Sequence, residues 1–214
     1  MTPRELLTSG AAELGFALSM EQSNSIFIFL TELTKWNQKI NLTAIRDERD
    51  VIIKHVLDSL SYIKGFSPVP GLKLLDMGSG AGFPAIPIKL LHPAILVTMV
   101  EAVKKKASFL RHIIRTLKLI GIEVHDKRTQ EIPDSYRNVN DVVTARAFAD
   151  MNTAIVSGLP FLKHGGILVL SRGPEESING WQLKKYGAEL ENKIDLVLPF
   201  SDYKRTIWIL KRVT

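Results

Sequence analysis

The chain has 214 residues, a formal net charge of +6 and no cysteine. This length fits one domain, or one domain with a small extension. The lack of cysteine excludes disulfides, thiolate metal sites and a cysteine nucleophile. No apolar run reaches the ~18 residues of a membrane span, and the charged N-terminal stretch does not resemble a signal peptide. We therefore expect a cytoplasmic protein, and we expect a monomer without a metal ion.

The N-terminal third of the chain shows apolar residues at helical spacing. This pattern predicts helices over 3–15, 20–40 and 47–63. The next stretch, 65–71, is rich in proline and glycine and is the best candidate for a boundary. We therefore predict two parts, an N-terminal helical region over 1–68 and a second domain over 69–214.

After this boundary, short apolar runs alternate with helical stretches, which predicts a Rossmann-like α/β fold with helices around a mostly parallel sheet. The seven expected strands are 72–77, 95–100, 122–125, 141–145, 166–171, 194–199 and 205–211. The expected helices are 84–91, 103–120, 128–132, 151–163 and 175–190. No helical stretch separates the last two strands, so we expect them to form an antiparallel hairpin.

A glycine-rich turn follows the first expected strand. The strand runs into Asp76, and the turn then carries Gly78, Gly80 and Gly82, followed by Phe83. Glycine lets the backbone approach a nucleotide closely and adopt positive φ. A dinucleotide site requires G-x-G-x-x-G, whereas these glycines are spaced G-x-G-x-G. The spacing favours S-adenosylmethionine (SAM); the alternative is a turn that only joins a strand to a helix.

Three further positions fall where a cofactor would lie, at the carboxyl ends of the strands. Glu101 ends the second strand, 19 residues after the last glycine of the turn, where a carboxylate accepts hydrogen bonds from ribose hydroxyls. Thr129 and Gln130 follow the third strand and offer polar groups to adenine. Arg146 follows the fourth strand. Its partner is a cofactor carboxylate, an RNA phosphate or a structural aspartate, and we take it as the leading catalytic candidate.

Basic residues gather in one segment of the chain. Residues 101–128 carry eight basic and three acidic side chains, whereas residues 1–70 are nearly neutral. Such a segment is typical of a phosphate-binding face, and the alternative is a solvated helix. The candidate RNA-binding residues are Lys104, Lys105, Lys106, Arg111, Arg115 and Lys118. The ring side chains of Trp36 and His55 lie among apolar residues, and we predict that both pack inward.

The residues also limit the substrate. Carbon-5 methylation of pyrimidines needs a cysteine nucleophile, and methylation of exocyclic amines commonly uses an Asn/Asp-Pro-Pro-aromatic motif that is missing after the fourth expected strand. A substrate atom that is nucleophilic while neutral remains, and guanine N7 is such an atom. Its methylation needs alignment more than acid–base catalysis.

The chain resembles the bacterial small-subunit ribosomal RNA methyltransferase G family, also called glucose-inhibited division protein B. The matching segments are Trp36-Asn37, Asn41-Leu42-Thr43-Ala44, Arg46-Asp47, His55-Val56-Leu57-Asp58-Ser59, Leu75 to Pro84, Ile86-Pro87, Lys105-Lys106, Phe109-Leu110 and Arg146-Ala147-Phe148. The resemblance implies methyl transfer from SAM to N7 of one guanine in 16S rRNA of the small ribosomal subunit. It also implies SAM contacts at Gly78, Phe83, the Thr129-Gln130 backbone and Arg146.

The chain departs from the family pattern at Ala85, Gln130 and Arg172, where the family commonly has glycine, an acidic residue and lysine. Two other functions stay open from the residues. One is a SAM-dependent methyltransferase with a non-rRNA substrate, and the other is a non-catalytic RNA-binding factor in ribosome assembly. A nicotinamide-dependent dehydrogenase is disfavoured by Phe83 in the turn.

Overall fold

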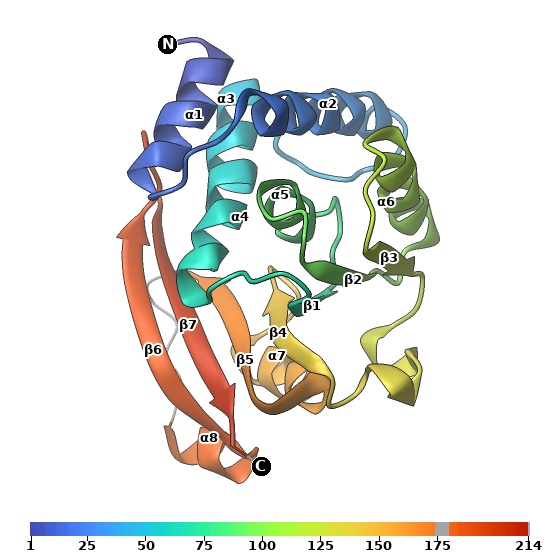
Figure 1. Ribbon diagram of the computed structural model, residues 1–214, viewed down its shortest axis with the longest axis vertical. Helices are drawn as coiled ribbons and strands as arrows, with labels where there is room; N and C mark the ends of the chain where they lie inside the picture. The colour runs from blue at the N-terminus through green and yellow to red at the C-terminus, as the bar shows by residue number, and fades with distance from the viewer. Residues whose placement is uncertain (174–179, 214) are drawn as a thin grey trace.

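A computed structural model describes residues 1–173 and 180–213 (Figure 1). Its centre is a seven-stranded sheet in the order β3-β2-β1-β4-β5-β7-β6. The strands are β1 (Lys73–Met77), β2 (Leu96–Val100), β3 (Ile122–His125), β4 (Asn140–Ala145), β5 (Leu162–Arg172), β6 (Ala188–Val197) and β7 (Lys204–Arg212). The first five strands are parallel, and β7 pairs antiparallel with both β5 and β6. The predicted α/β fold with a terminal hairpin is therefore confirmed.

Helices cover both faces of this sheet. The helices are α1 (Pro3–Glu13), α2 (Met20–Asn37), α3 (Glu48–Val51), α4 (Asp58–Ser61), α5 (Ala85–Leu91), α6 (Lys104–Thr116), α7 (Met151–Gly158) and α8 (Gly180–Lys185). In Figure 1 the helices α1 to α6 gather above the sheet, and α7 lies behind β4 and β5. Short 3₁₀ turns occupy 62–65, 129–131, 134–136 and 159–161.

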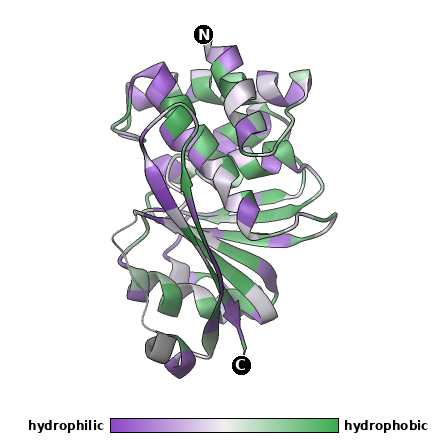
Figure 2. Cartoon of the chain, turned by 90° about the vertical axis from the view of Figure 1, so that its left-hand side faces the viewer, coloured by the Kyte–Doolittle hydropathy of each residue, from purple (hydrophilic) through white to green (hydrophobic). Residues whose placement is uncertain are grey.

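The two faces of the sheet carry two separate hydrophobic cores because successive strand residues point to opposite sides. Leu74 and Val142 face the N-terminal helices, whereas their neighbours Leu75 and Val143 pack toward α7. Figure 2 shows hydrophobic residues along the middle strands and hydrophilic residues on the outer surfaces of the helices. The N-terminal helices and one face of the sheet thus share a continuous core; the boundary between residues 68 and 69 stays a prediction.

The third predicted helix is an uninterrupted helical run over 48–65 that contains a π-helical segment, Ile52–Leu57, between α3 and α4. Asp47 caps its start by accepting from the backbone N–H of Asp50. Within the run, the Ser59 hydroxyl donates to the carbonyl of His55 at 2.5 Å. Such side-chain bonds to a carbonyl one turn earlier compete with the regular helical ladder.

Three helices predicted after the first strand are shorter in the structure. The helix predicted over 103–120 ends at Thr116, because Lys118 adopts a left-handed φ of 50° and the N–H of Leu119 bonds back to the carbonyl of Ile114. The helix predicted over 128–132 is a single 3₁₀ turn, Thr129–Glu131. The helix predicted over 151–163 ends at Gly158.

The prediction for 175–190 was wrong over its last residues, while 174–179 lie outside the described residues. A short helix ends at Lys185, Gly187 turns with φ of 72°, and β6 begins at Ala188. This edge strand is mostly exposed, so it lacks the apolar alternation that marks a strand in sequence. Strand β5 also begins earlier than expected, at Leu162, because the chain passes Gly165 at φ of 76° without leaving the sheet.

Candidate functional site

A cavity of about 220 Å³ lies at the carboxyl ends of β1, β2 and β3. Its walls come from the glycine turn, from the end of β2, from the turn after β3 and from the segment after β4. The lining residues are Gly78, Val100, Glu101, Ala102, Lys127, Arg128, Thr129, Gln130 and Phe148. Four residues predicted from the sequence as cofactor ligands, Gly78, Glu101, Thr129 and Gln130, therefore lie around one cavity.

The glycine turn uses positive φ at three positions, 66° at Gly78, 56° at Gly80 and 92° at Gly82. Only glycine adopts this region at no steric cost. A Cβ on Gly78 would lie 2.7 Å from the ring of Phe148, and a Cβ on Gly82 would lie 2.5 Å from Ile86. The glycines thus keep the turn close to its neighbours and leave the cavity open.

Glu101 fastens the glycine turn to the end of β2. One carboxylate oxygen accepts from the N–H of Gly80 at 2.8 Å, and the other accepts from the N–H of Val103 at 2.7 Å. Each carboxylate oxygen has two lone pairs, so each keeps one for a further donor. Two free lone pairs on one carboxylate at the cavity wall suit the two hydroxyls of a ribose.

Asp76 lies beneath the turn and is completely buried. One of its oxygens accepts from the Thr144 hydroxyl at 2.7 Å, and the other has no partner among the described residues. Burial raises the pKa of Asp76 to about 7, although the nearby hydroxyls of Ser79 and Thr144 act in the opposite direction. An unpartnered buried carboxyl oxygen is an uncommon feature that often marks a functional site.

The Arg146 side chain reaches away from this cavity toward the π-helical segment. It donates to the carbonyl of Lys54 at 3.0 Å, contacts Nδ1 of His55 at 2.5 Å and lies 3.4 Å from the carboxylate of Asp58. Asp58 is buried and also pairs with Arg205 at 3.0 Å. Of the partners expected for Arg146, the structure therefore supplies the structural aspartate.

His55 is the buried, hydrogen-bonded histidine that the sequence predicts. Its Nε2 lies 2.7 Å from the hydroxyl of Thr43, and its ring stacks on Phe83 with centroids 4.8 Å apart. Burial, and secondly the charge of Arg146, lower the pKa of His55 to about 3. The imidazole is therefore neutral near pH 7 and serves as a packing and hydrogen-bonding group.

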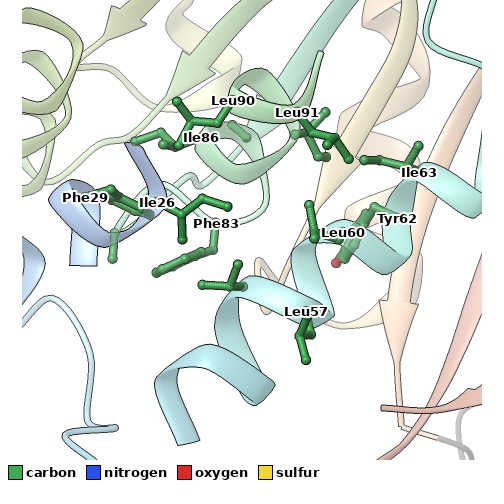
Figure 3. Packing of buried hydrophobic residues seen from close by; sticks show 14 of the residues in the cluster. Ile26, Phe29, Leu57, Leu60, Tyr62, Ile63, Phe83, Ile86, Leu90 and Leu91 are labelled. Carbon is green, nitrogen blue, oxygen red and sulfur yellow. The ribbon is translucent and has the colours of Figure 1, made fainter. Parts of the chain in front are cut away.

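Phe83 directs its ring into the core rather than into the cavity. Figure 3 shows the ring beside Ile26 and Phe29 of α2, and its centroid lies 5.1 Å from that of Phe29. The glycine turn is thereby fixed to the N-terminal helices. Trp36 likewise packs on Phe109, with centroids 5.6 Å apart, as predicted for an inward-facing residue.

The basic residues of α6 differ in their surroundings. Lys104, Lys105 and Arg115 are exposed. Arg111 instead pairs with Asp126 at 3.0 Å and donates to the carbonyl of Val124, so it ties α6 to β3. Of the two other predicted residues, Lys106 is half-buried, and Lys118 is exposed beyond the end of the helix. Lys127, which was not predicted, lines the cavity.

Phe148 and Lys127 were not predicted from the sequence as site residues, although both line the cavity. The signal for Phe148 was its place two residues after Arg146, at the carboxyl end of β4. The left-handed φ of 48° at Ala147 turns the chain between them, so the two side chains leave in different directions. A single sequence does not reveal such a turn at an alanine.

The strand order, with a glycine turn after β1 and an antiparallel last strand pair, defines the class I methyltransferase fold. A solved structure of a SAM-dependent methyltransferase from Aquifex aeolicus shares it, with a TM-score of 0.56 at 17% identity over 75% of this chain and 92% of that one. Residues 22–207 match the family described as rRNA small subunit methyltransferase G. The chain belongs to this family.

Two relatives illustrate how fully the chain matches. The ribosomal RNA small subunit methyltransferase G of Caldanaerobacter subterraneus subsp. tengcongensis is 40% identical, with 98% of this chain and 90% of that protein covered. The protein of the same name from Geobacter metallireducens is 38% identical, with 98% and 96% covered. Among the described residues, no helix has the length and apolar character to cross a membrane. Over the same residues, no group of His, Cys, Asp and Glu side chains is arranged to hold a metal ion.

Proposed function

We propose that this protein transfers a methyl group from SAM to N7 of a guanine in 16S rRNA. The observation that carries the proposal is the cavity that joins the glycine turn to Glu101 and to the Thr129-Gln130 turn. The family supports a methyltransferase, and relatives of this chain bear the name ribosomal RNA small subunit methyltransferase G.

The residues around the cavity fit SAM. The open lone pairs of Glu101 suit the ribose hydroxyls, and Gly78 has no Cβ that would collide with the Phe148 ring at the cavity wall. Thr129 and Gln130 present a hydroxyl, an amide and backbone groups to an adenine edge. Gln130 departs from the acidic residue common in the family, but a contact through its backbone N–H does not depend on the side chain.

SAM supplies an electrophilic methyl group when bound, and guanine N7 offers an in-plane lone pair without a proton. The protein then has no proton to remove before transfer, and its task is to align the two reactants. The low pKa of His55, about 3, agrees with such a reaction, because an imidazole of this pKa is a poor base for taking a proton near pH 7. We propose that Arg146 acts by holding the segment 54–58 in place beside the glycine turn.

The deciding experiment is transfer of labelled methyl from SAM into small ribosomal subunits that lack the modification, followed by identification of the labelled nucleoside. We expect 7-methylguanosine at one position of 16S rRNA. SAM binding without labelled rRNA would direct the search to another substrate, such as tRNA, protein or a small molecule. Binding of ribosomal RNA without any affinity for SAM would support the assembly-factor alternative.

A further inference from the structure

A second cavity, of about 440 Å³, lies between the end of α2 and the loop over 41–46. Its lining residues are Leu33, Thr34, Asn37, Gln38, Asn41, Thr43, Ile45, Arg46 and Val51. The methyl-transfer site described above does not use this groove, which includes the Asn41-Leu42-Thr43 segment. Its volume lies within the ~300–1,000 Å³ typical of ligand sites.

The groove combines an apolar floor with unused hydrogen-bonding groups. Leu33, Ile45 and Val51 supply the floor. Three lining residues, Gln38, Asn41 and Arg46, have exposed side chains. None of these side chains makes a hydrogen bond or ion pair with the described residues. None of the lining residues is acidic. Amides, a guanidinium and an apolar floor are complementary to the edge, phosphate and face of a nucleotide.

Asn37 has a different role in the same groove. Its amide donates to the carbonyl of Thr43 at 2.9 Å, and its side-chain oxygen accepts from the N–H groups of Leu42 and Thr43. Both lone pairs of its side-chain oxygen and one of its two amide N–H groups therefore fix the loop. The groove is preformed, which lowers the entropy cost of binding.

A chain of hydrogen bonds sets the direction of the Thr43 hydroxyl. Arg146 can only donate, so the close contact of 2.5 Å makes Nδ1 of His55 the acceptor and places the imidazole proton on Nε2. The carbonyl of Lys54 also lies 3.2 Å from Nδ1, but a proton there would face the guanidinium N–H. The Thr43 oxygen thus accepts from Nε2–H of His55.

The Thr43 oxygen also accepts from the N–H of Ile45 at 3.1 Å, and both of its lone pairs are then used. Its own proton has no acceptor among the described residues, while Thr43 lines the groove. The hydroxyl is therefore left as a donor for whatever enters. Arg146, which follows β4, thus acts through His55 to make the Thr43 hydroxyl a hydrogen-bond donor in the second cavity.

We infer that this groove binds a nucleotide of the RNA substrate other than the guanine that is methylated, with its base on the apolar floor and its phosphate at Arg46. The inference rests on the proposed function for the identity of the RNA. The neighbouring nucleotide, rather than the reacting one, is the occupant because His55 and Phe83 stack between Thr43 and the glycine turn. The reacting guanine has to approach the turn itself.

The test measures binding of unmethylated small ribosomal subunits and, separately, binding of SAM by calorimetry. Arg46→Ala should weaken subunit binding about 10-fold and flatten the slope of log K against log salt by ~0.7, the value for one phosphate contact on a single strand. Thr43→Val should weaken it roughly 5-fold, the loss of one hydrogen bond, and Thr43→Ser should restore it. SAM affinity should stay unchanged in Arg46→Ala.

Two variants outside the groove serve as controls. Lys73→Ala removes an exposed charge at the amino end of β1, and Thr31→Val removes a hydroxyl on α2 that donates to the carbonyl of Phe27. Both should bind subunits as the parent protein does. If Thr43→Val lowers the melting temperature sharply, Arg46→Ala, Gln38→Ala and Asn41→Ala decide instead.

Equal subunit affinity of the groove variants and the controls would overturn the inference, as would a parent protein that binds no small-subunit RNA. Weaker subunit binding by Arg46→Ala would support nucleotide binding in the groove even if the parent protein transferred no methyl group, because the binding measurement does not depend on methyl transfer. Failure of methyl transfer and failure of the groove are therefore distinguishable.

Discussion

Gly80 shows that a glycine can be required for its backbone rather than for space. A Cβ at this position would have no atom closer than the carbonyl oxygen of Gly78, at 3.8 Å, but φ is 56°. A β-branched residue there is strained by ~1–3 kcal/mol. Relief of that strain would move the backbone N–H of residue 80, which donates a hydrogen bond to Glu101. We expect Gly80→Val to lower SAM affinity at least ~10-fold, measured by calorimetry.

Gly71 provides a matched control for this strain. It has φ of 81° and open space around its Cβ position, and it lies before β1, away from the cavity. Gly71→Val should lower the melting temperature by a similar amount and leave SAM affinity unchanged. Parent-like SAM affinity in Gly80→Val would contradict a cofactor role for the turn.

Asp76 should make the stability of the ligand-free protein depend on pH. Its pKa rises from 3.8 to about 7 on folding because the carboxyl is buried. A raised carboxyl pKa contributes stability that is fully present below pH 3.8 and is lost as the pH rises toward 7. Asp76→Asn stays uncharged, so its free energy of unfolding should fall less between pH 5 and pH 8 than that of the parent.

Urea unfolding at the two pH values measures this difference, and groups common to both proteins cancel in the comparison. Asp134→Asn is the control, because Asp134 is exposed and pairs with Arg137 on the surface. Parallel pH dependence of Asp76→Asn and the parent protein would show that Asp76 is ionised throughout the range.

At the scale of elements, Arg146 joins β4 to the π-helical segment. Arg146→Lys keeps a positive charge near Asp58 but cannot reach the carbonyl of Lys54 and Nδ1 of His55 together. We expect amide hydrogen exchange in 52–57 to accelerate, with a loss of ~1–3 kcal/mol in stability and a ~10-fold or larger fall in methyl transfer.

Exchange measured by mass spectrometry resolves this segment from the rest of the chain. Arg137→Lys, which changes a surface pair with Asp134, should leave exchange in 52–57 as it is. Slow exchange there in Arg146→Lys, together with lost methyl transfer, would give Arg146 a direct role at the substrate instead of a positioning role.

The parallel core of the sheet was well predicted from the sequence. Its buried strands are short apolar runs bounded by turn residues, and such a local pattern can be recognised in a single sequence. Sequence analysis placed the start of β6 at 194 instead of Ala188, because the exposed first half of that strand has no apolar alternation, and it predicted a helix over 128–132, where a 3₁₀ turn resembles a helix start. The glycine turn and Glu101 were foreseeable from spacing alone. The contact of Arg146 with His55 was not, since it joins residues 91 positions apart through tertiary packing.

For the whole molecule, the distribution of positive charge determines which residues are free to meet RNA. Lys104, Lys105 and Arg115 are exposed on α6, whereas Arg111 is committed to Asp126 and the carbonyl of Val124. These candidate RNA-binding residues therefore include three cations that face solvent and one, Arg111, that supports the fold. The two kinds should respond differently to salt.

We expect each of Lys104→Ala, Lys105→Ala and Arg115→Ala to reduce the salt slope of small-subunit binding by ~0.7–0.9, the contribution of one phosphate contact. Arg111→Ala should leave the slope almost unchanged and lower the melting temperature instead, because it removes the link between α6 and β3. Binding isotherms at several KCl concentrations give both quantities against the parent protein. A slope that falls only in Arg111→Ala would reverse this assignment and make the exposed lysines a solvated face, since counterions are released only where a cation neutralises a phosphate.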